Sequence, residues 1–255
     1  MYEETTEKLL DFIEKSPTAF QAVDEMQKRL TENGFEVLSE KEYWKLIPGG
    51  KYLVTRNNSA LIAFCIPEKE SRVFHIMASH SDSPSFKIKE NPEMEVDNKY
   101  VKLNVERYGG MLCAPWFDRP LSVAGRVIVK EGDSFVTKLV DVDRDLLMIP
   151  NLAIHMNREV NDGYKYNAQV DMLPLYGDIS SKDTFMKTIA KAAGVKEEDI
   201  LGHDIFLYNR VKGSIWGANE EFVSSSRLDD LQCAFSSLQG FLKGEKKGVR
   251  GSTLC

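Results

Sequence analysis

The sequence has few cysteines, no long apolar run and no excess of positive charge. Its four cysteines, Cys65, Cys113, Cys233 and Cys255, form neither a C-x-x-C pair nor a disulfide-like framework, so a metal site made of thiolates is not expected. No apolar run reaches the length of about 18 residues that a membrane-spanning helix needs. The net charge of −6 argues against a surface that binds nucleic acid or an anionic membrane.

The chain also lacks the features of a secreted protein. It begins Met1-Tyr-Glu-Glu-Thr-Thr-Glu-Lys8, which is polar and acidic, whereas a signal peptide opens with basic and then apolar residues. This start, together with the scattered cysteines, predicts a cytoplasmic protein. With 42% apolar and 28% charged residues among 255, the composition is typical of a globular chain and excludes a disordered or fibrous one.

Two amphipathic helices and a β-hairpin are predicted near the start of the chain. Apolar residues recur at helical spacing from Leu9 to Ile13 and again from Phe20 to Leu30. Pro17 separates the two runs, because proline suits the first turn of a helix and not its interior. Asn57-Asn58 then divides the strand-like residues 51–66 into two runs, which is typical of a hairpin.

A nearly continuous apolar run, residues 72–79, ends in the polar segment His80-Ser-Asp82-Ser-Pro84. Continuous apolarity predicts a strand that is covered on both faces, as in a sheet between helices. Ligand sites in such sheets gather beyond the carboxyl ends of the strands. The polar segment therefore lies where a site is expected.

From about residue 87 the apolar pattern changes to short alternating strands, at residues 101–105, 122–130 and 134–142. Such strands indicate a mainly antiparallel sheet, and therefore a second domain inserted into the first. We expect three segments: the first part of one domain (1–86), an inserted β-rich domain (87–215) and a return to the first domain (216–255).

The final segment is predicted to hold one helix and no further strand. Ser224-Ser-Ser226 can cap a helix whose apolar residues recur from Leu228 to Leu242 at helical spacing. Residues 244–255 show no strand pattern. A sheet whose last helix has no successor indicates a chain that stops early.

His80 and Asp82 form the first candidate site. On an extended segment, residues two apart point the same way, so both side chains can face one ligand. Zinc favours imidazole and carboxylate ligands, and a carboxylate commonly orients a liganding histidine. The same pair also fits an ordinary polar strand end.

Asp229 and Asp230 form the second candidate site. Two carboxylates at a helix start interact favourably with the helix dipole. A carboxylate at this place can also bridge two metal ions, which lie ~3.5–4 Å apart in hydrolases. One histidine and one aspartate cannot complete a tetrahedral zinc site, so further ligands are needed.

The remaining candidates have weaker signals. His155 ends the apolar run 149–154 and faces either a polar site or a wet interface. His75 lies among apolar strand residues and is predicted to be a core histidine. Glu220-Glu221 resembles a catalytic carboxylate pair, but a solvated charge run is the simpler interpretation. The sequence contains no P-loop, no G-x-G-x-x-G fingerprint and no G-x-S-x-G elbow.

A series of motifs runs in order along the chain, from about residue 9 to residue 243. The motifs are Phe12-Ile-Glu-Lys-Ser-Pro-Thr-Ala-Phe-Gln-Ala-Val23, Pro48-Gly-Gly-Lys-Tyr-Leu-Val-Thr-Arg-Asn57, His80-Ser-Asp-Ser-Pro84, Tyr108-Gly-Gly110, Trp116-Phe-Asp-Arg119, Ala124-Gly-Arg-Val127, Ile149-Pro-Asn-Leu-Ala-Ile-His155 and Ser225-Ser-Arg-Leu-Asp-Asp-Leu231. Together they resemble the M18 family of zinc aminopeptidases, which includes aspartyl aminopeptidase.

The resemblance implies a mixed-sheet α/β/α metallopeptidase domain interrupted by a β-rich domain through which the protein dimerises or forms larger homo-oligomers. It implies an enzyme that removes N-terminal residues, acidic ones among them, from peptide substrates. Two Zn²⁺ ions are implied, with His80 as a ligand of one ion, Asp229 as the bridging ligand and Asp82 orienting His80. His155, on the inserted domain, would reach the active site of a neighbouring subunit.

The sequence departs from the family after Asp229. In the family, the helix there leads to a strand that ends in Glu-Glu-Val-Gly, which supplies the general base and a ligand, and a later Asp and a C-terminal His complete the metal shell. None of these follows here, because the sequence diverges near Gly248. The expectation is a C-terminally truncated chain that is inactive alone. Two alternatives stay open: a non-catalytic assembly module acting through the inserted domain, and a different metal-dependent deacylase.

Overall fold

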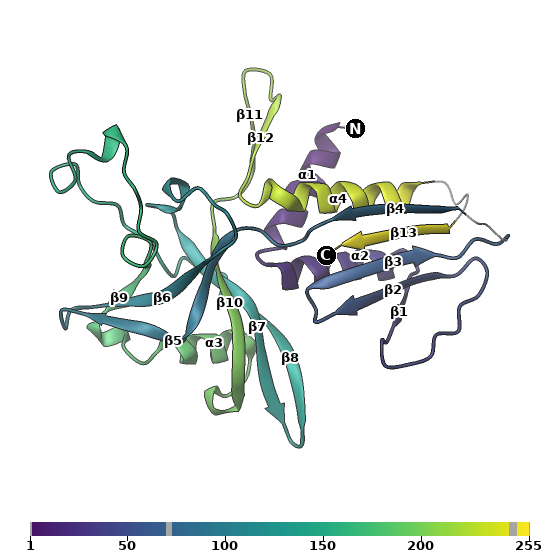
Figure 1. The fold of residues 1–255 in the computed structure, drawn as a ribbon, viewed down its shortest axis with the longest axis horizontal. Coiled ribbons are helices and arrows are strands. Elements are labelled where there is room, and N and C mark those ends of the chain that lie inside the picture. The colour runs from purple at the N-terminus through teal and green to yellow at the C-terminus, as the bar shows by residue number, and fades with distance from the viewer. Residues whose placement is uncertain (1, 70–72, 245–248, 255) are drawn as a thin grey trace. The chain divides into compact units, whose positions relative to one another are not determined.

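The computed structural model describes residues 2–69, 73–244 and 249–254 (Figure 1). The chain divides into two compact units, of which unit 1 comprises Met1–Ser83 and Lys212–Cys255, and unit 2 comprises Pro84–Val211. Arg72, which begins a predicted strand, and Gly248 lie outside the described residues. None of the helices in the described part of the chain has the length and apolar character that a membrane crossing requires.

Unit 1 begins with the two predicted helices, α1 (Tyr2–Glu14) and α2 (Ala19–Glu32). The hydroxyl of Thr18 accepts a hydrogen bond from the backbone N–H of Phe20 at 3.3 Å and so caps α2. Gly34 follows α2 with a φ of +81°, a left-handed conformation that favours glycine. A further helix, α4 (Leu228–Lys243), ends the unit's helical part.

In the described part of unit 1, five strands form a mixed sheet in the order β1-β2-β3-β13-β4. The β1–β2 and β13–β4 pairs are parallel, whereas β3 pairs antiparallel with β2 and β13. The prediction of an α/β fold with a mixed sheet is confirmed. The strands are β1 (Glu36–Leu38), β2 (Lys51–Arg56), β3 (Ala60–Cys65), β4 (Phe74–Ser79) and β13 (Val249–Leu254).

Helices α2 and α4 pack on one face of this sheet and α1 packs on these helices (Figure 1), and Leu53, Leu61 and Ala63 of the sheet join their apolar side chains in a core. The prediction that strand β4 is covered on both faces is wrong, because Phe74 and Ile76 are each 70% exposed. Alternate side chains of a strand point to opposite faces, and the described helices cover only one of them.

The prediction that no strand follows the last helix is also wrong. Residues Val249–Leu254 form β13, which lies between β3 and β4. Their sequence shows no apolar alternation, so the pairing partners on both sides, rather than local propensity, account for the strand.

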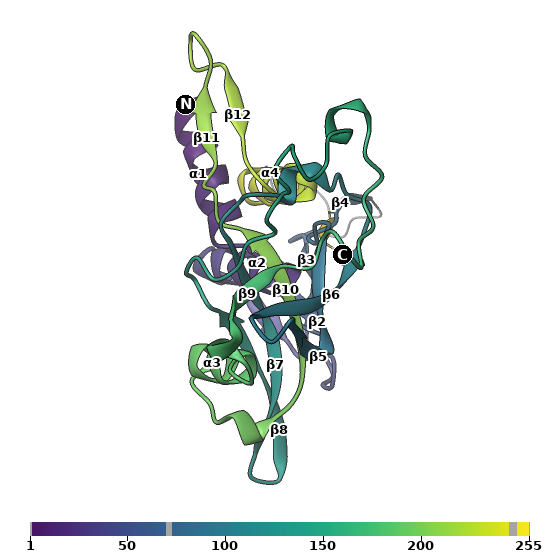
Figure 2. The ribbon, with the colours of Figure 1, turned by 90° about the vertical axis from the view of Figure 1, so that its left-hand side faces the viewer.

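A two-stranded ribbon, β11 (Ser214–Trp216) and β12 (Phe222–Ser224), precedes α4. It lies beside α1 in both views (Figures 1 and 2). Glu220 and Glu221 are exposed between its strands, in agreement with the interpretation as a solvated charge run.

Unit 2 is built on a sheet whose six described strands are all antiparallel, in the order β8-β7-β10-β5-β6-β9. Helix α3 (Phe185–Ala193) packs Phe185 and Ile189 into the unit's own core. The strands are β5 (Ser85–Val96), β6 (Tyr100–Tyr108), β7 (Leu121–Glu131), β8 (Ser134–Asp141), β9 (Leu175–Asp178) and β10 (Ile200–Asn209), and short 3-10 helices occur at Ala114–Trp116, Val160–Asp162, Ile179–Ser181 and Glu197–Asp199.

Candidate metal centre

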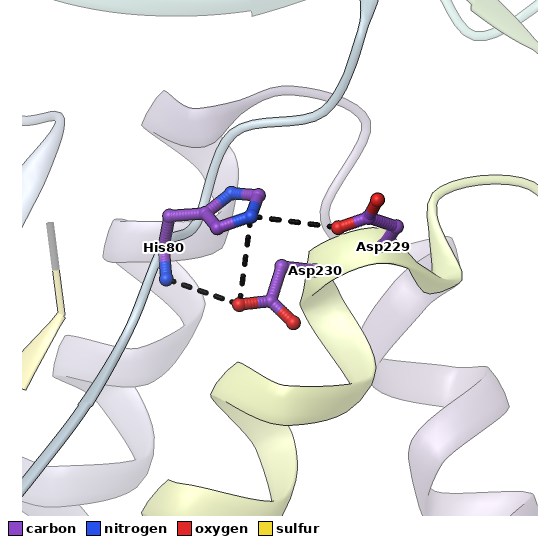
Figure 3. A group of neighbouring side chains, drawn as sticks. All are labelled: His80, Asp229 and Asp230. Carbon is purple, nitrogen blue, oxygen red and sulfur yellow. Dashed lines mark hydrogen bonds and ion pairs between the residues drawn. The ribbon is translucent and has the colours of Figure 1, made fainter. Parts of the chain in front are cut away.

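Two segments of unit 1 that are far apart in the sequence meet at the candidate metal centre (Figure 3). His80 directly follows β4, at the carboxyl end of that strand, where ligand sites of α/β sheets collect. Asp229 and Asp230 lie at the start of α4, and Asp230 follows His80 by 150 residues. The fold therefore brings together one imidazole and two carboxylates.

The side chains of this cluster converge on a common point. Nε2 of His80 lies 3.4 Å from Oδ1 of Asp229 and 3.6 Å from Oδ2 of Asp230. One ligand atom from each of the three residues lies within 4.8 Å of the others. Since imidazole and carboxylate are ligands that zinc favours, the donor set fits a zinc ion, with His80, Asp229 and Asp230 as the residues that would hold it.

Asp82 lies on the other side of the imidazole ring. Nδ1 of His80 is 3.1 Å from both the backbone oxygen and Oδ1 of Asp82. Both oxygens are acceptors, so in the neutral ring Nδ1 carries the proton and Nε2 keeps its lone pair. This tautomer leaves Nε2, which faces the two carboxylates, available to a cation.

The surroundings of His80 favour its charged form. Partial burial alone would lower the pKa of the imidazole, but the negative charge of Asp230 and the hydrogen bonds to Asp82 together raise this pKa above its ordinary value. A divalent cation would therefore compete with a proton for Nε2.

Asp230 was not assigned a role by sequence reasoning, because adjacent carboxylates at a helix start look alike. The structure separates them: the side chain of Asp229 is 87% exposed, and that of Asp230 is 21% exposed. Oδ2 of Asp230 accepts a hydrogen bond from the backbone N–H of His80 at 3.2 Å. Asp230 thus joins the two segments, and Asp229 is open to a ligand.

Ser83 makes a second connection between these segments. Its hydroxyl donates a hydrogen bond to the backbone oxygen of Asp229 at 2.9 Å. The pattern H-x-D-S gave no signal for this contact, because the partner is 146 residues away.

The start of α4 differs from the prediction that Ser224-Ser-Ser226 caps it. The N-cap residue is Arg227, with φ 60° and ψ 21°, and its side chain makes no capping hydrogen bond. Asp229 and Asp230 have non-helical dihedral angles, and the peptide bond between them is cis. The residues that carry the carboxylates therefore lie in a kinked lead-in rather than in a regular first turn.

His155 is not part of this cluster. It lies in unit 2, in an exposed segment between β8 and β9, and its proposed reach to a neighbouring subunit stays a prediction. His75 is exposed on β4, so the prediction of a core histidine is wrong. The strand β4 lies at the edge of the described sheet, so it has a neighbouring strand on one side only.

Fold and site together define an α/β protein whose mixed sheet carries a candidate imidazole–carboxylate metal centre. A profile of the family described as Aminopeptidase I zinc metalloprotease (M18) matches residues 12–253. The chain therefore belongs to the M18 family, as the motifs predicted.

Relatives and solved structures agree with this assignment. "Probable M18 family aminopeptidase 2" of Clostridium acetobutylicum is 48% identical over 250 residues, which cover 95% of this chain and 58% of the relative. In the cryo-EM structure of the Ape4 and Nbr1 complex, a chain 32% identical matches with a TM-score of 0.93, covering 99% of this chain and 54% of that one. The S. cerevisiae mApe1 dodecamer, 26% identical, matches with a TM-score of 0.84 over 99% of this chain and 60% of that one.

The chain spans less than two thirds of the length of each of these proteins.

Proposed function

We propose that this chain is the metal-binding part of a zinc-dependent aminopeptidase, which removes N-terminal residues from peptides. Its membership of a family described as zinc metalloproteases supports the reaction class and the metal. The observation that carries the proposal is the convergence of His80, Asp229 and Asp230, whose ligand atoms lie within 4.8 Å of one another.

Each residue of the cluster has a proposed role. His80 would hold a zinc ion through Nε2, and Asp229 would be the bridging ligand that the family resemblance implies. Asp82 accepts a hydrogen bond from Nδ1–H and orients the ring, while Asp230 accepts a hydrogen bond from the backbone N–H of His80 and adds a second carboxylate to that of Asp229. Zinc, when bound, supplies a Lewis acid for the scissile carbonyl and lowers the pKa of bound water.

We further propose that these 255 residues do not hydrolyse peptides alone, and that the complete enzyme accepts acidic N-terminal residues. The support for inactivity is that the Glu-Glu-Val-Gly segment, which supplies the base in the family, is not among them. The support for acidic substrates is the resemblance to a family that includes aspartyl aminopeptidase. The purified chain with added zinc is expected to leave reporter substrates with N-terminal Asp, Glu or Leu intact. Zinc-dependent hydrolysis that survives repurification would contradict this.

Homo-oligomerisation through the inserted unit, with His155 reaching a neighbouring subunit, is also a proposal. The mApe1 protein of S. cerevisiae forms a dodecamer, which supports assembly in the family. The cytoplasmic location stays a prediction.

Zinc binding is the direct test of the site. Isothermal titration of the chain with zinc is expected to show binding that His80→Ala abolishes. His75→Ala is the matched control, because His75 is an exposed histidine on the preceding strand, and it should bind as the wild type does. Equal binding by all three proteins would exclude His80 as a ligand.

The alternative of a non-catalytic assembly module is favoured by one observation. Unit 2 has an apolar core of its own, which is a feature of a module that can act separately from the metal cluster of unit 1. Light scattering of the chain with and without residues 87–215 tests it, and a monomer in both cases would contradict assembly.

A further inference from the structure

The lead-in to α4 holds the two carboxylates without help from a helix cap. Arg227 has a left-handed φ of 60°, which is unfavourable for a residue other than glycine. Asp229 and Asp230 depart from helical dihedral angles as well. Side-chain contacts must therefore keep this segment in place, and two of them, from Ser83 and His80, come from the metal-binding side.

A third set of contacts is made by the guanidinium of Arg227 itself. Its Nη2 donates a hydrogen bond to the backbone oxygen of Ile13 at 3.0 Å, and its Nη1 donates one to the hydroxyl of Ser226, also at 3.0 Å. The Nε atom is buried. A planar fork of donors can fix two acceptors at once, which a lysine cannot do in the same geometry.

The partner of Arg227 lies at the end of α1. The carbonyl of Ile13 is one of the last of that helix, where the helix dipole is negative, and it also accepts a hydrogen bond from the backbone N–H of Ser16 at 3.1 Å. The last turn of α1 contains no basic residue of its own. The cation of Arg227 therefore meets a complementary charge at a fixed point of the fold.

We propose that Arg227 is a positioning residue for the metal centre: by binding the carboxyl end of α1, its guanidinium holds residues 227–230 in the conformation that directs Asp229 and Asp230 towards His80. Through this contact the conformation of the lead-in would depend on Ile13, which is not among the residues of the metal cluster. The proposal goes beyond zinc binding, since it concerns the conformation before any cation binds.

Arg227 could instead stabilise the fold in general, but residues other than Arg227 hold α1 and α4 together. Apolar packing joins α1 to α4 independently of Arg227, with the rings of Phe12 and Phe235 5.8 Å apart. Both rings also lie beneath the guanidinium of Arg29. Loss of Arg227 should therefore loosen the lead-in while the helices stay packed.

Hydrogen exchange at the amide of His80 tests this without metal, because that amide donates to Asp230. In the full chain, Arg227→Ala should exchange this amide about tenfold faster than the wild type, and Arg227→Lys should give an intermediate rate. The matched control is Leu53→Ala, a core variant that lowers Tm without touching the lead-in.

A second measurement is titration with zinc alone, where Arg227→Ala is expected to lose about 10- to 100-fold in affinity. The two variants are compared at temperatures equally far below the Tm of each. If the His80 amide then exchanges no faster in Arg227→Ala than in Leu53→Ala, the positioning role is overturned. Absence of zinc binding by the wild type would instead overturn the proposed function, and the exchange rates would still decide the role of Arg227.

Discussion

At the scale of single residues, the two ring nitrogens of His80 have different partners. Nδ1 lies 3.1 Å from two oxygens of Asp82, one on the backbone and one on the side chain. Nε2 faces Asp229 and Asp230. Because the backbone oxygen is present whatever the side chain, the orientation of the ring does not depend on the carboxylate of Asp82 alone.

This geometry predicts a partial effect for Asp82→Ala. The variant keeps the backbone acceptor and loses the carboxylate, so we expect zinc affinity to fall by about tenfold rather than to vanish. Titration calorimetry measures the affinity, with the exposed residue His75, substituted by alanine, as a reference for surface changes. An affinity loss as complete as that of His80→Ala would show that the backbone oxygen has no orienting effect.

The sequence singled out His80 and Asp229, which the structure brings together, but it did not show how Asp230 is used. His80 stood out because it follows an apolar run, whereas Asp229 was distinguished from Asp230 only by the resemblance to the M18 family. The hydrogen bond from His80 to Asp230 joins residues 150 positions apart, and no local pattern reports such a pairing. Arg227 was quoted in a motif without a role for the same reason.

At the scale of elements, periodicity predicted those that bury one apolar face. Helices α1 and α2 and the β2–β3 hairpin appear where expected, and Asn57 and Asn58 both take positive φ in the hairpin turn. Strand β13 was not predicted, because its sequence lacks the apolar alternation by which other strands are recognised. It is a strand because it pairs with β3 on one side and with β4 on the other. The exposed face of β4 was missed because a run of apolar residues does not say how many layers cover it.

Asp204 links the central strands of unit 2 through two ion pairs, from which a pH dependence of stability follows. Oδ1 of Asp204, on β10, lies 2.8 Å from Nζ of Lys87 on β5, and its Oδ2 lies 2.8 Å from Nη2 of Arg126 on β7. Burial alone would raise the pKa of Asp204, but the hydrogen bonds and charges of the two cations lower it. The folded state therefore favours the carboxylate.

Asp204→Asn should lower the free energy of unfolding by about 1 kcal/mol at neutral pH, because the site is partly solvated. The sign follows from the lowered pKa: the contribution is complete above the ordinary pKa of aspartate, about 3.9, and is lost as pH falls through the lowered value. Urea unfolding of both proteins measures the difference. A difference that stays constant from pH 7 down to pH 3 would argue against the ion pair as its source.

At the scale of the whole molecule, each unit has a core of its own. Unit 2 buries a large apolar cluster, in which Phe86, Leu103 and Val123 are completely buried. Its two ends lie side by side, since the hydroxyl of Ser85 donates a hydrogen bond to the backbone oxygen of Leu207 at 2.5 Å. Adjacent ends and an independent core are features of a domain that folds alone.

We therefore expect residues 84–211 to fold without the rest of the chain. An isolated unit should show dispersed amide resonances and one cooperative unfolding transition, because its sheet is complete within its own bounds. The control is a variant with Phe185→Ala, which empties a buried position under α3 and should lower the free energy of unfolding strongly, by about 3–5 kcal/mol. A broad transition that this substitution leaves unchanged would indicate that the unit lacks a packed core.

The adjacency of Ser85 and Leu207 also bears on how the metal cluster assembles. Ser83 and Asp229 are 146 residues apart, and closing so long a flexible segment costs conformational entropy that rises with the logarithm of its length. Once unit 2 has folded, only the short connectors outside it remain free, which lowers that cost by roughly 1–2 kcal/mol. Folding of unit 2 therefore brings the segments of Ser83 and Asp229 close together before the metal cluster forms.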